Sequence, residues 1–417
     1  MITSDVRQKA HKGRLVLRQL ATLTEEEKNK ALMKVAEEIS LRKEEILQAN
    51  EQDRKGAIEE GVSQALLDRL TLTEKRLDEM AEGLRDLARL EDPIGEVLDT
   101  STLANGLRID KVRVPLGMIG MVYEARPNVT CDAAGTALKT GNAILLRGSA
   151  SAIHSNLALT KVIQAALKET AVPSEAVQLV EDLKRSAVQE MITANGLIDV
   201  IIPRGGAGLI SRVVKESTVP VIETGVGNCH IYVDQAAEPE MATNIVMNAK
   251  IDRPAVCNAV ETILIHQEWA NRYLVELCHL LSEQGVELRG CPETQKIFPQ
   301  VKPAVESDWE TEFLDKVLAV KIVDSLESAL THINRYGTHH SEAIVTDDSA
   351  TAQLFLTGVD AAAVYHNAST RFTDGGQFGF GVEIGISTQK LHARGPMGLK
   401  EMTSYQYRMY GTGQTRG

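Results

Sequence analysis

The chain has few cysteines and no long apolar run, and each shortage excludes a class of protein. Its 417 residues contain five cysteines at irregular spacing and no Cys-x-x-Cys pair, so they provide neither a disulfide framework nor the usual ligands of structural zinc. No stretch of about eighteen apolar residues occurs, and residues 1–13 lack the apolar core of an export signal. We therefore expect a cytoplasmic protein with no metal ion and no membrane span.

The charge of the chain is also one-sided. Lysine and arginine number 45 against 57 aspartates and glutamates, a formal net charge of −12. Such a balance argues against a general affinity for nucleic acid, and an anionic substrate would need a local cationic pocket. The length predicts two domains and a smaller element.

The first ninety residues predict helices. Thr24 with Glu27 has the spacing of a capping box, and apolar residues recur at helical spacing after it. Thr71 with Glu74 repeats the pattern before a second apolar face, which consists of Leu77, Met80, Ala81, Leu84, Leu87 and Ala88.

Two alternating segments predict a β-arm. Asn105-Gly106 separates two extended runs and is a strong hairpin signal. Residues 403–410 alternate in the same way near the end of the chain. We expect these segments, within 105–118 and 395–417, to pair with each other and to contact a partner subunit.

Strand and helix patterns then alternate, which predicts parallel sheets with helices on both faces. In such sheets, ligands bind beyond the carboxyl ends of the strands. Arg147 and Ser149 occupy such a position, as do Arg204, Gly205 and Gly206. The expected strands lie at 119–123, 143–148, 177–180, 198–203, 259–265, 317–323, 343–345 and 361–365, and the clearest helices at 152–170, 326–336 and 349–356.

Cys257 is the candidate nucleophile. A thiolate attacks carbonyl carbon well and leaves readily when a hydride arrives, so a cysteine suits chemistry that passes through a thioester. Arg253 lies close in the sequence and would favour the thiolate, and an apolar strand pattern follows at 259–265. The alternative is a buried cysteine without chemistry.

Other polar residues allow two interpretations each. Gly205 and Gly206 could hold a phosphate or form a plain tight turn, and Arg147 and Arg204 could meet a 2′-phosphate, which favours NADP over NAD. Glu223 could be a general base or a hydrogen-bonding hinge carboxylate.

Asn128 could stabilise an oxyanion or belong to a turn. Ser369, Thr370 and Arg371 stand in a polar, glycine-rich stretch, which could hold a carboxylate or phosphate or form a solvated loop.

Taken together, these segments resemble the aldehyde dehydrogenase superfamily. The resemblance rests on Glu223-Thr224-Gly225, on Cys257 and on the closing segment 395–400. Residues 122–141, 253–261, 366–385 and 391–399 are most similar to the branch of the superfamily that reduces γ-glutamyl phosphate. Three positions depart from the oxidising members: Arg126-Pro127-Asn128, Arg147 and Gly205-Gly206.

The resemblance implies an α/β fold with two doubly wound, Rossmann-like domains and an oligomerisation arm. It implies a cofactor-binding domain of residues 1–104 and 119–225 with part of 377–394, and a catalytic domain of residues 226–376. The arm would then consist of 105–118 and 395–417, in a dimer or tetramer.

The reaction that the resemblance implies is NADPH-dependent reduction of γ-glutamyl phosphate to glutamate 5-semialdehyde in proline biosynthesis, through a thioester on Cys257. Asn128 would hold the oxyanion, and glutamate 5-kinase would be a transient partner. The implied cofactor contacts are Arg147, Ser149, Arg204, Gly205, Gly206 and Glu312, and the implied substrate contacts are Arg126, Arg253, Ser369, Thr370 and Arg371.

Two alternatives use the same cysteine. In an aldehyde-oxidising NAD(P) dehydrogenase, water rather than phosphate would take the acyl group, and Glu223 would activate it. In a cysteine hydrolase, His266 or His230 would serve as the base and no nicotinamide would be needed.

Overall fold

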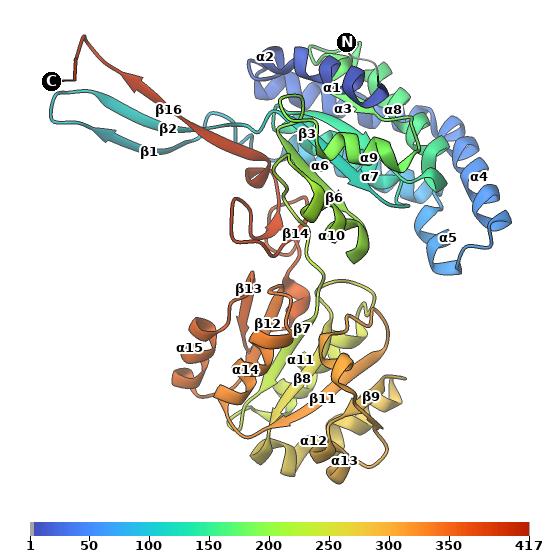
Figure 1. Cartoon of the computed structure of the whole chain (residues 1–417), viewed down its shortest axis with the longest axis vertical. Helices are drawn as coiled ribbons and strands as arrows, with labels where there is room; N and C mark the ends of the chain where they lie inside the picture. Colours follow the sequence, from blue (N-terminus) through green and yellow to red (C-terminus); the bar gives the residue numbers. More distant parts are fainter. Residues whose placement is uncertain (1–3, 417) are drawn as a thin grey trace. The chain divides into compact units, whose positions relative to one another are not determined.

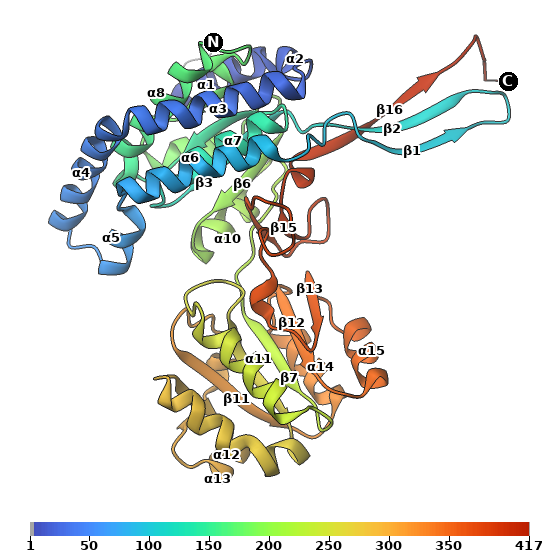
Figure 2. The same ribbon diagram turned by 180° about the vertical axis from the view of Figure 1, so that it is seen from behind.

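The computed structural model describes residues 4–416. The chain divides into two compact units. Unit 1 consists of residues up to Glu223 with Phe380–Gly385 and Met397–Gly417, and unit 2 of Thr224–Gly379 and Ile386–Pro396. Figures 1 and 2 show both units from opposite sides. Within residues 4–416, no helix is both long and apolar enough to cross a membrane.

Unit 1 contains a four-stranded parallel sheet in the order β5-β4-β3-β6. The chain runs outward from β3 to β5 and then returns to place β6 on the other side of β3, so the strand order reverses between β3 and β6. In doubly wound sheets, this switch point is where ligands bind. The strands are β3 (Met118–Tyr123), β4 (Ala143–Arg147), β5 (Val177–Leu179) and β6 (Val200–Arg204).

Helices cover both faces of this sheet (Figure 2). The helices α7 and α8 pack beneath α3 and α6, while α1 and α9 contact each other and β3. The helices of unit 1 are α1 (Asp5–Leu15), α2 (Leu17–Leu20), α3 (Glu25–Leu41), α4 (Lys43–Glu59), α5 (Gln64–Leu70), α6 (Glu74–Arg89), α7 (Asn128–Lys139), α8 (Ile153–Leu167), α9 (Arg185–Ile192) and α10 (Ala207–Glu216).

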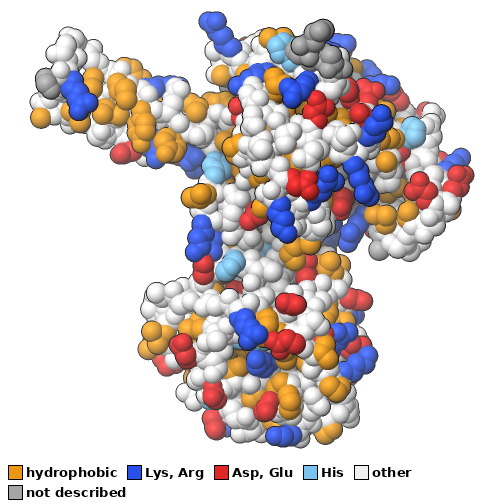
Figure 3. Space-filling model, in the orientation of Figure 1, with side chains coloured by type: hydrophobic (Ala, Val, Ile, Leu, Met, Phe, Trp, Pro, Cys, Tyr) orange, Lys and Arg blue, Asp and Glu red, His pale blue; other side chains and the backbone are white. Residues whose placement is uncertain are grey.

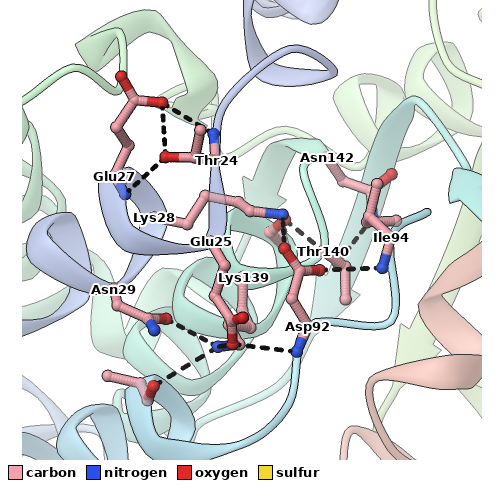
Figure 4. Close-up of polar contacts among 12 residues, drawn as sticks. Thr24, Glu25, Glu27, Lys28, Asn29, Asp92, Ile94, Lys139, Thr140 and Asn142 are labelled. Carbon is pink, nitrogen blue, oxygen red and sulfur yellow. Dashed lines mark hydrogen bonds and ion pairs between the residues drawn. The ribbon is translucent and has the colours of Figure 1, made fainter. Parts of the chain in front are cut away.

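The two predicted N-terminal helices form, but one cap differs. At α3, the hydroxyl of Thr24 accepts a hydrogen bond from the backbone of Glu27 and the Glu27 carboxylate accepts one from Thr24 (Figure 4), which confirms the capping box. At α6, Thr73 is the N-cap, not Thr71. Thr71 instead ends α5, where its hydroxyl donates to the Leu67 carbonyl. An N-cap residue directly precedes the first helical residue, and for α6 that residue is Thr73.

Two buried lysines join the helices of unit 1 to one another (Figure 4). Lys139, at the end of α7, donates to Asn29 at 2.7 Å and forms an ion pair with Glu25 at 3.2 Å. Lys28 pairs with Asp92. Because a buried charge is costly unless it is paired, the contacts of Lys139 fix α3 against α7, and that of Lys28 fixes α3 against the segment after α6.

The predicted hairpin and the tail form one three-stranded sheet, β1-β2-β16. β1 (Val97–Thr102) and β2 (Arg108–Pro115) flank the Asn105-Gly106 turn, where Gly106 has φ +84°, and β16 (Thr403–Tyr410) pairs antiparallel with β2. The pairing of hairpin and tail is therefore confirmed. β1 is exposed throughout and β16 beyond Thr403, and hydrophobic side chains lie along the sheet (Figure 3).

Unit 2 is a second parallel α/β unit, with strand order β10-β9-β11-β8-β7-β12-β13. Its strands are β7 (Cys229–Val233), β8 (Val260–His266), β9 (Glu287–Gly290), β10 (Lys302–Pro303), β11 (Val317–Val323), β12 (Ser341–Val345) and β13 (Ala363–His366). The helices α11 (Pro239–Ile251), α12 (Gln267–Glu283) and α13 (Pro292–Ile297) pack on one face, and α14 (Leu326–Tyr336) and α15 (Ser349–Gly358) on the other.

Two short strands, β14 (Gly385–Ser387) and β15 (Gly395–Met397), pair where the chain passes between the units. The α/β class and the two doubly wound sheets that the sequence predicts are thus observed.

Candidate active site

Cys257 lies in an irregular turn between α11 and β8, and its side chain is half-buried. The other four cysteines are all buried. The predicted junction of loop and strand is therefore correct. The turn meets β8 at its amino end, so Cys257 does not lie at the carboxyl edge of the unit 2 sheet.

Asn258, the residue after Cys257, is buried and joins this turn to the segment 369–373. Its side-chain amide donates to the carbonyls of Arg371 at 3.2 Å and Thr373 at 2.9 Å. In return, the hydroxyl of Thr370 donates to the Asn258 carbonyl at 2.7 Å. The structure thus brings Ser369, Thr370 and Arg371 next to the nucleophile turn, although more than 110 residues separate them in sequence.

Arg371 is engaged by protein groups. Its Nε and Nη2 atoms lie 3.2 and 3.1 Å from Asp252, and Nη1 donates to the side chain of Asn258. Arg253, which is next to Asp252, is exposed on the same turn. Arg253 could be predicted from the sequence and Asp252 could not, because no local pattern marks an ion pair across 119 residues.

A second segment, just before β7, holds the other side of the turn. Gly227 lies so close that a Cβ atom there would overlap the backbone carbonyl of Cys257. The thiol of Cys229 donates to that same carbonyl at 3.2 Å. Burial raises the pKa of Cys229 well above its usual value, so this thiol stays protonated and can donate.

Glu312 belongs to the same group of contacts. Its carboxylate accepts a hydrogen bond from the Gly227 backbone at 2.8 Å. Burial raises the pKa of Glu312, and the hydrogen bond from Gly227 opposes this shift. Glu312 therefore contacts the segment that supports Cys257 within unit 2.

The remaining predicted residues belong to unit 1, at the carboxyl edge of its sheet. Arg204 ends β6, and Gly205 and Gly206 connect it to α10, while Arg147 ends β4 and Ser149 lies two residues beyond it. Arg147 donates to the carbonyls of Gly148 and Leu183, both at 2.9 Å, and burial lowers its pKa. Ser149 shares a hydrogen bond of 2.8 Å with Ser151.

The turn after β6 already binds an anionic oxygen. The backbone N–H of Gly206, just before α10, donates to the carboxylate of Glu124 at 2.9 Å. A Cβ atom on Gly205 would meet the same carboxylate. Sequence analysis did not single out Glu124, and its position fits the preference of a helix N-terminus for negative charge.

Asn128 begins α7, two residues beyond Arg126, and its amide donates to Asp132 at 3.0 Å. Burial raises the pKa of Asp132 to about 6, and the contact with Asn128 opposes this shift. Glu223 is half-buried and ends the first part of unit 1. These three predicted residues, Arg126, Asn128 and Glu223, thus belong to unit 1, whereas Cys257 belongs to unit 2.

The histidines of the hydrolase alternative lie elsewhere in unit 2. His266 ends β8, whose other end adjoins Cys257, and seven strand residues span roughly 23 Å. His230 is fully buried in β7, with Nδ1 3.1 Å from Glu342. Neither position favours a cysteine–histidine pair. Within residues 4–416, no group of three His, Cys, Asp or Glu residues has the arrangement of a metal site.

Comparison with known proteins identifies the family. The model of the aldehyde dehydrogenase family matches residues 3–295. The chain belongs to this family. Its relatives include the γ-glutamyl phosphate reductase of Geobacillus sp. (strain WCH70), 56% identical over 408 residues that cover 98% of each chain. The γ-glutamyl phosphate reductase of Moorella thermoacetica is 56% identical over 415 residues, which cover 100% of this chain and 99% of the relative.

A solved structure supports the same grouping. The crystal structure of γ-glutamyl phosphate reductase from Thermotoga maritima has a TM-score of 0.98 and 49% identity, and the match covers 99% of this chain and 100% of that one. Within the aldehyde dehydrogenase family, this chain therefore belongs with the γ-glutamyl phosphate reductases.

The close approach of Gly227 to Cys257 gives a testable prediction. In Gly227→Ala, the new Cβ should displace the nucleophile turn and destabilise the protein by about 1–3 kcal/mol. Thermal melting and the rate of Cys257 alkylation by iodoacetamide would measure both effects.

Gly83→Ala is the control, because no atom lies within 4 Å of the new Cβ and the residue is inside α6. This variant should melt at the same or a slightly higher temperature. If Gly227→Ala melts and reacts like the parent protein, the turn does not depend on this contact.

Proposed function

We propose that this chain reduces γ-glutamyl phosphate to glutamate 5-semialdehyde and releases phosphate, in proline biosynthesis, with NADPH as hydride donor and Cys257 as nucleophile. The observation that carries the reaction is the similarity to γ-glutamyl phosphate reductases, at 54–56% identity over at least 98% of the chain. We place the enzyme in the cytoplasm, as its irregularly spaced cysteines suggest.

The first step is acyl transfer to Cys257. The thiolate attacks the γ-carbonyl carbon, a C–S bond forms, the C–O bond to phosphate breaks, and inorganic phosphate leaves. Asn128 is the proposed side-chain donor to the oxyanion, together with the backbone N–H of Cys257. Arg126, Arg253, Ser369 and Thr370 are the proposed contacts to the substrate anions.

A nicotinamide cofactor supplies a hydride to the thioester carbonyl carbon. The tetrahedral intermediate then breaks its C–S bond, so that Cys257 is regained as the thiolate and the aldehyde is the product. In the direction of reduction, neither of these steps requires Glu223 to transfer a proton. We therefore propose that it is a hinge carboxylate and not a general base.

The residues at the carboxyl edge of the unit 1 sheet are suited to a dinucleotide. The Gly206 N–H already donates to a carboxylate, so it can receive an anionic oxygen of the cofactor. Arg147 Nε and Asn156 Nδ2 are buried without a hydrogen-bond partner beside β4. Arg147, Ser149, Arg204, Gly205 and Gly206 are the proposed contacts here, and Glu312 is a further proposed cofactor contact in unit 2.

Cys257→Ala should abolish phosphate-dependent reduction of NADP by glutamate 5-semialdehyde and leave NADPH binding intact, because only the nucleophile is lost. Turnover and the change of NADPH fluorescence on binding would measure the two properties. Cys278→Ala removes a buried thiol from α12 and should retain turnover.

The outcome also separates the alternatives. Turnover of the parent protein in phosphate-free buffer would indicate an aldehyde-oxidising dehydrogenase. Unchanged turnover of Cys257→Ala would contradict the thioester mechanism.

Arg204 is the proposed contact to the 2′-phosphate of NADPH. Arg204→Gln should raise the KM for NADPH about tenfold and leave the KM for NADH nearly unchanged, because one charge-assisted hydrogen bond is lost. Arg212→Gln removes a half-buried arginine of α10 that pairs with Glu216, and should change neither KM. Equal increases for both cofactors in Arg204→Gln would argue against a contact to the 2′-phosphate.

We also propose that β16 contacts a second copy of the chain. Tyr405, Tyr407 and Met409 lie on one face of this strand, and 50–61% of the surface of each is exposed. A row of exposed apolar residues on an edge strand is typical of an association surface.

Met409→Glu should therefore lower the sedimentation coefficient, because a charge would be buried in the interface. Gln406→Glu introduces the same charge on the opposite face of β16 and should leave sedimentation unchanged. An unchanged assembly in Met409→Glu would exclude this face from the interface.

A further inference from the structure

Arg371 contacts both ends of the turn that carries Cys257. At the beginning of the turn is Asp252, the C-cap of α11, and two nitrogens of Arg371 lie within 3.2 Å of its carboxylate. At the end of the turn is Asn258, whose side-chain oxygen accepts from Nη1. A single planar guanidinium therefore joins residues 252 and 258 across Cys257.

The backbone on both sides of this contact is also fixed. The Asn258 amide donates to the carbonyls of Arg371 and Thr373, and the Thr370 hydroxyl donates to the Asn258 carbonyl. Asn258 and Thr370 are buried, at 4% and 0% exposure. These contacts are short and mutual, so the segment 369–373 and the turn 252–258 hold each other in place.

The ion pair also affects what Arg371 can offer a substrate. Its side chain is 16% exposed, and three of its nitrogens already serve Asp252 or Asn258. The neighbouring carboxylate of Asp252 partly neutralises the guanidinium and so weakens its attraction for a substrate anion. Arg253, exposed beside Asp252, is better placed to meet an anion.

We propose that Arg371 is a positioning residue, which fixes the nucleophile turn through Asp252 and Asn258 and does not bind the substrate anion. This inference rests on the proposed role of Cys257 as nucleophile. A displacement of about 1 Å of a reacting group can cost roughly 100-fold in rate. Loss of the contact should therefore lower kcat rather than raise the KM.

The test uses Arg371→Met, Asp252→Asn and the double variant in the full-length protein. Turnover is followed with glutamate 5-semialdehyde, phosphate and NADP, and hydrogen exchange of the peptide that contains residues 252–259 is followed by mass spectrometry. Each single variant should lower kcat at least tenfold, change the KM for the semialdehyde less than threefold, and speed exchange of this peptide.

The kcat of the double variant should be no lower than that of Arg371→Met, because the two substitutions break the same interaction. Arg371→Lys keeps the charge but lacks the planar fork, so it should recover only part of kcat. Arg335→Met is the matched control, since it removes an exposed arginine that pairs with Glu306 in the same unit.

A rise of tenfold or more in the KM of Arg371→Met with kcat nearly unchanged, and no effect of Asp252→Asn, would overturn the proposal. If Arg371→Met does not fold, Asp252→Asn still decides the question, because Asp252 is exposed and its loss leaves the arginine in place. If the parent protein lacks reductase activity, the proposed function fails, whereas hydrogen exchange still tests whether the ion pair fixes the turn.

Discussion

The place of the candidate nucleophile depends on contacts to its backbone, because the turn that carries it has no regular structure of its own. The Cys257 carbonyl faces Gly227 and accepts from the Cys229 thiol, and the next residue, Asn258, is held by the segment 369–373. Two segments that are distant in sequence, 227–229 and 369–373, thus converge on these two residues. The thiol itself can react only if these backbone contacts leave its side chain partly exposed, as they do.

The two units place their candidate residues at opposite edges of their own sheets. In unit 1, Arg147 and Arg204 are the last residues of the parallel strands on the two sides of β3, as expected at a switch point. In unit 2, Cys257 precedes β8 and Gly227 precedes β7, so the site lies at the amino edge. The general rule for doubly wound sheets therefore finds the first group of residues but not the second.

The regular elements of the fold could be predicted from the sequence, because each has a local pattern. Periodicity found the strands and helices, since β11 and α14 have the predicted bounds and the six apolar positions of α6 are buried. The Asn105-Gly106 hairpin followed from turn chemistry, and the family from segments that include Cys257. The cap of α6 was placed two residues early, because Thr71 and Thr73 both precede suitable residues and only tertiary structure shows which one α6 uses.

The contacts that hold the site could not be predicted in the same way. No sequence motif marks Asp252, Cys229 or Glu124. Their partners, Arg371, Cys257 and Gly206, lie 119, 28 and 82 residues away. A hydrogen bond or ion pair of this kind depends on which loops the fold brings together, and no local pattern records it. The role of Gly227 likewise follows from the side-chain atom that it lacks, and only the fold shows which backbone then approaches it.

Charge pairing within each unit decides which arginines can serve an anionic ligand. With a net charge of −12, the chain attracts phosphate or carboxylate most strongly where a cation is not already neutralised by the protein. Arg371 is paired with the carboxylate of Asp252, whereas Arg147 donates to neutral backbone carbonyls and keeps its charge. Arg253 is exposed on the nucleophile turn, whereas the nearby charge of Arg204 already lowers the pKa of Asp132 against the effect of burial. Loss of the Asp252 carboxylate would leave Arg371 with Asn258 as its side-chain partner and would so loosen the turn.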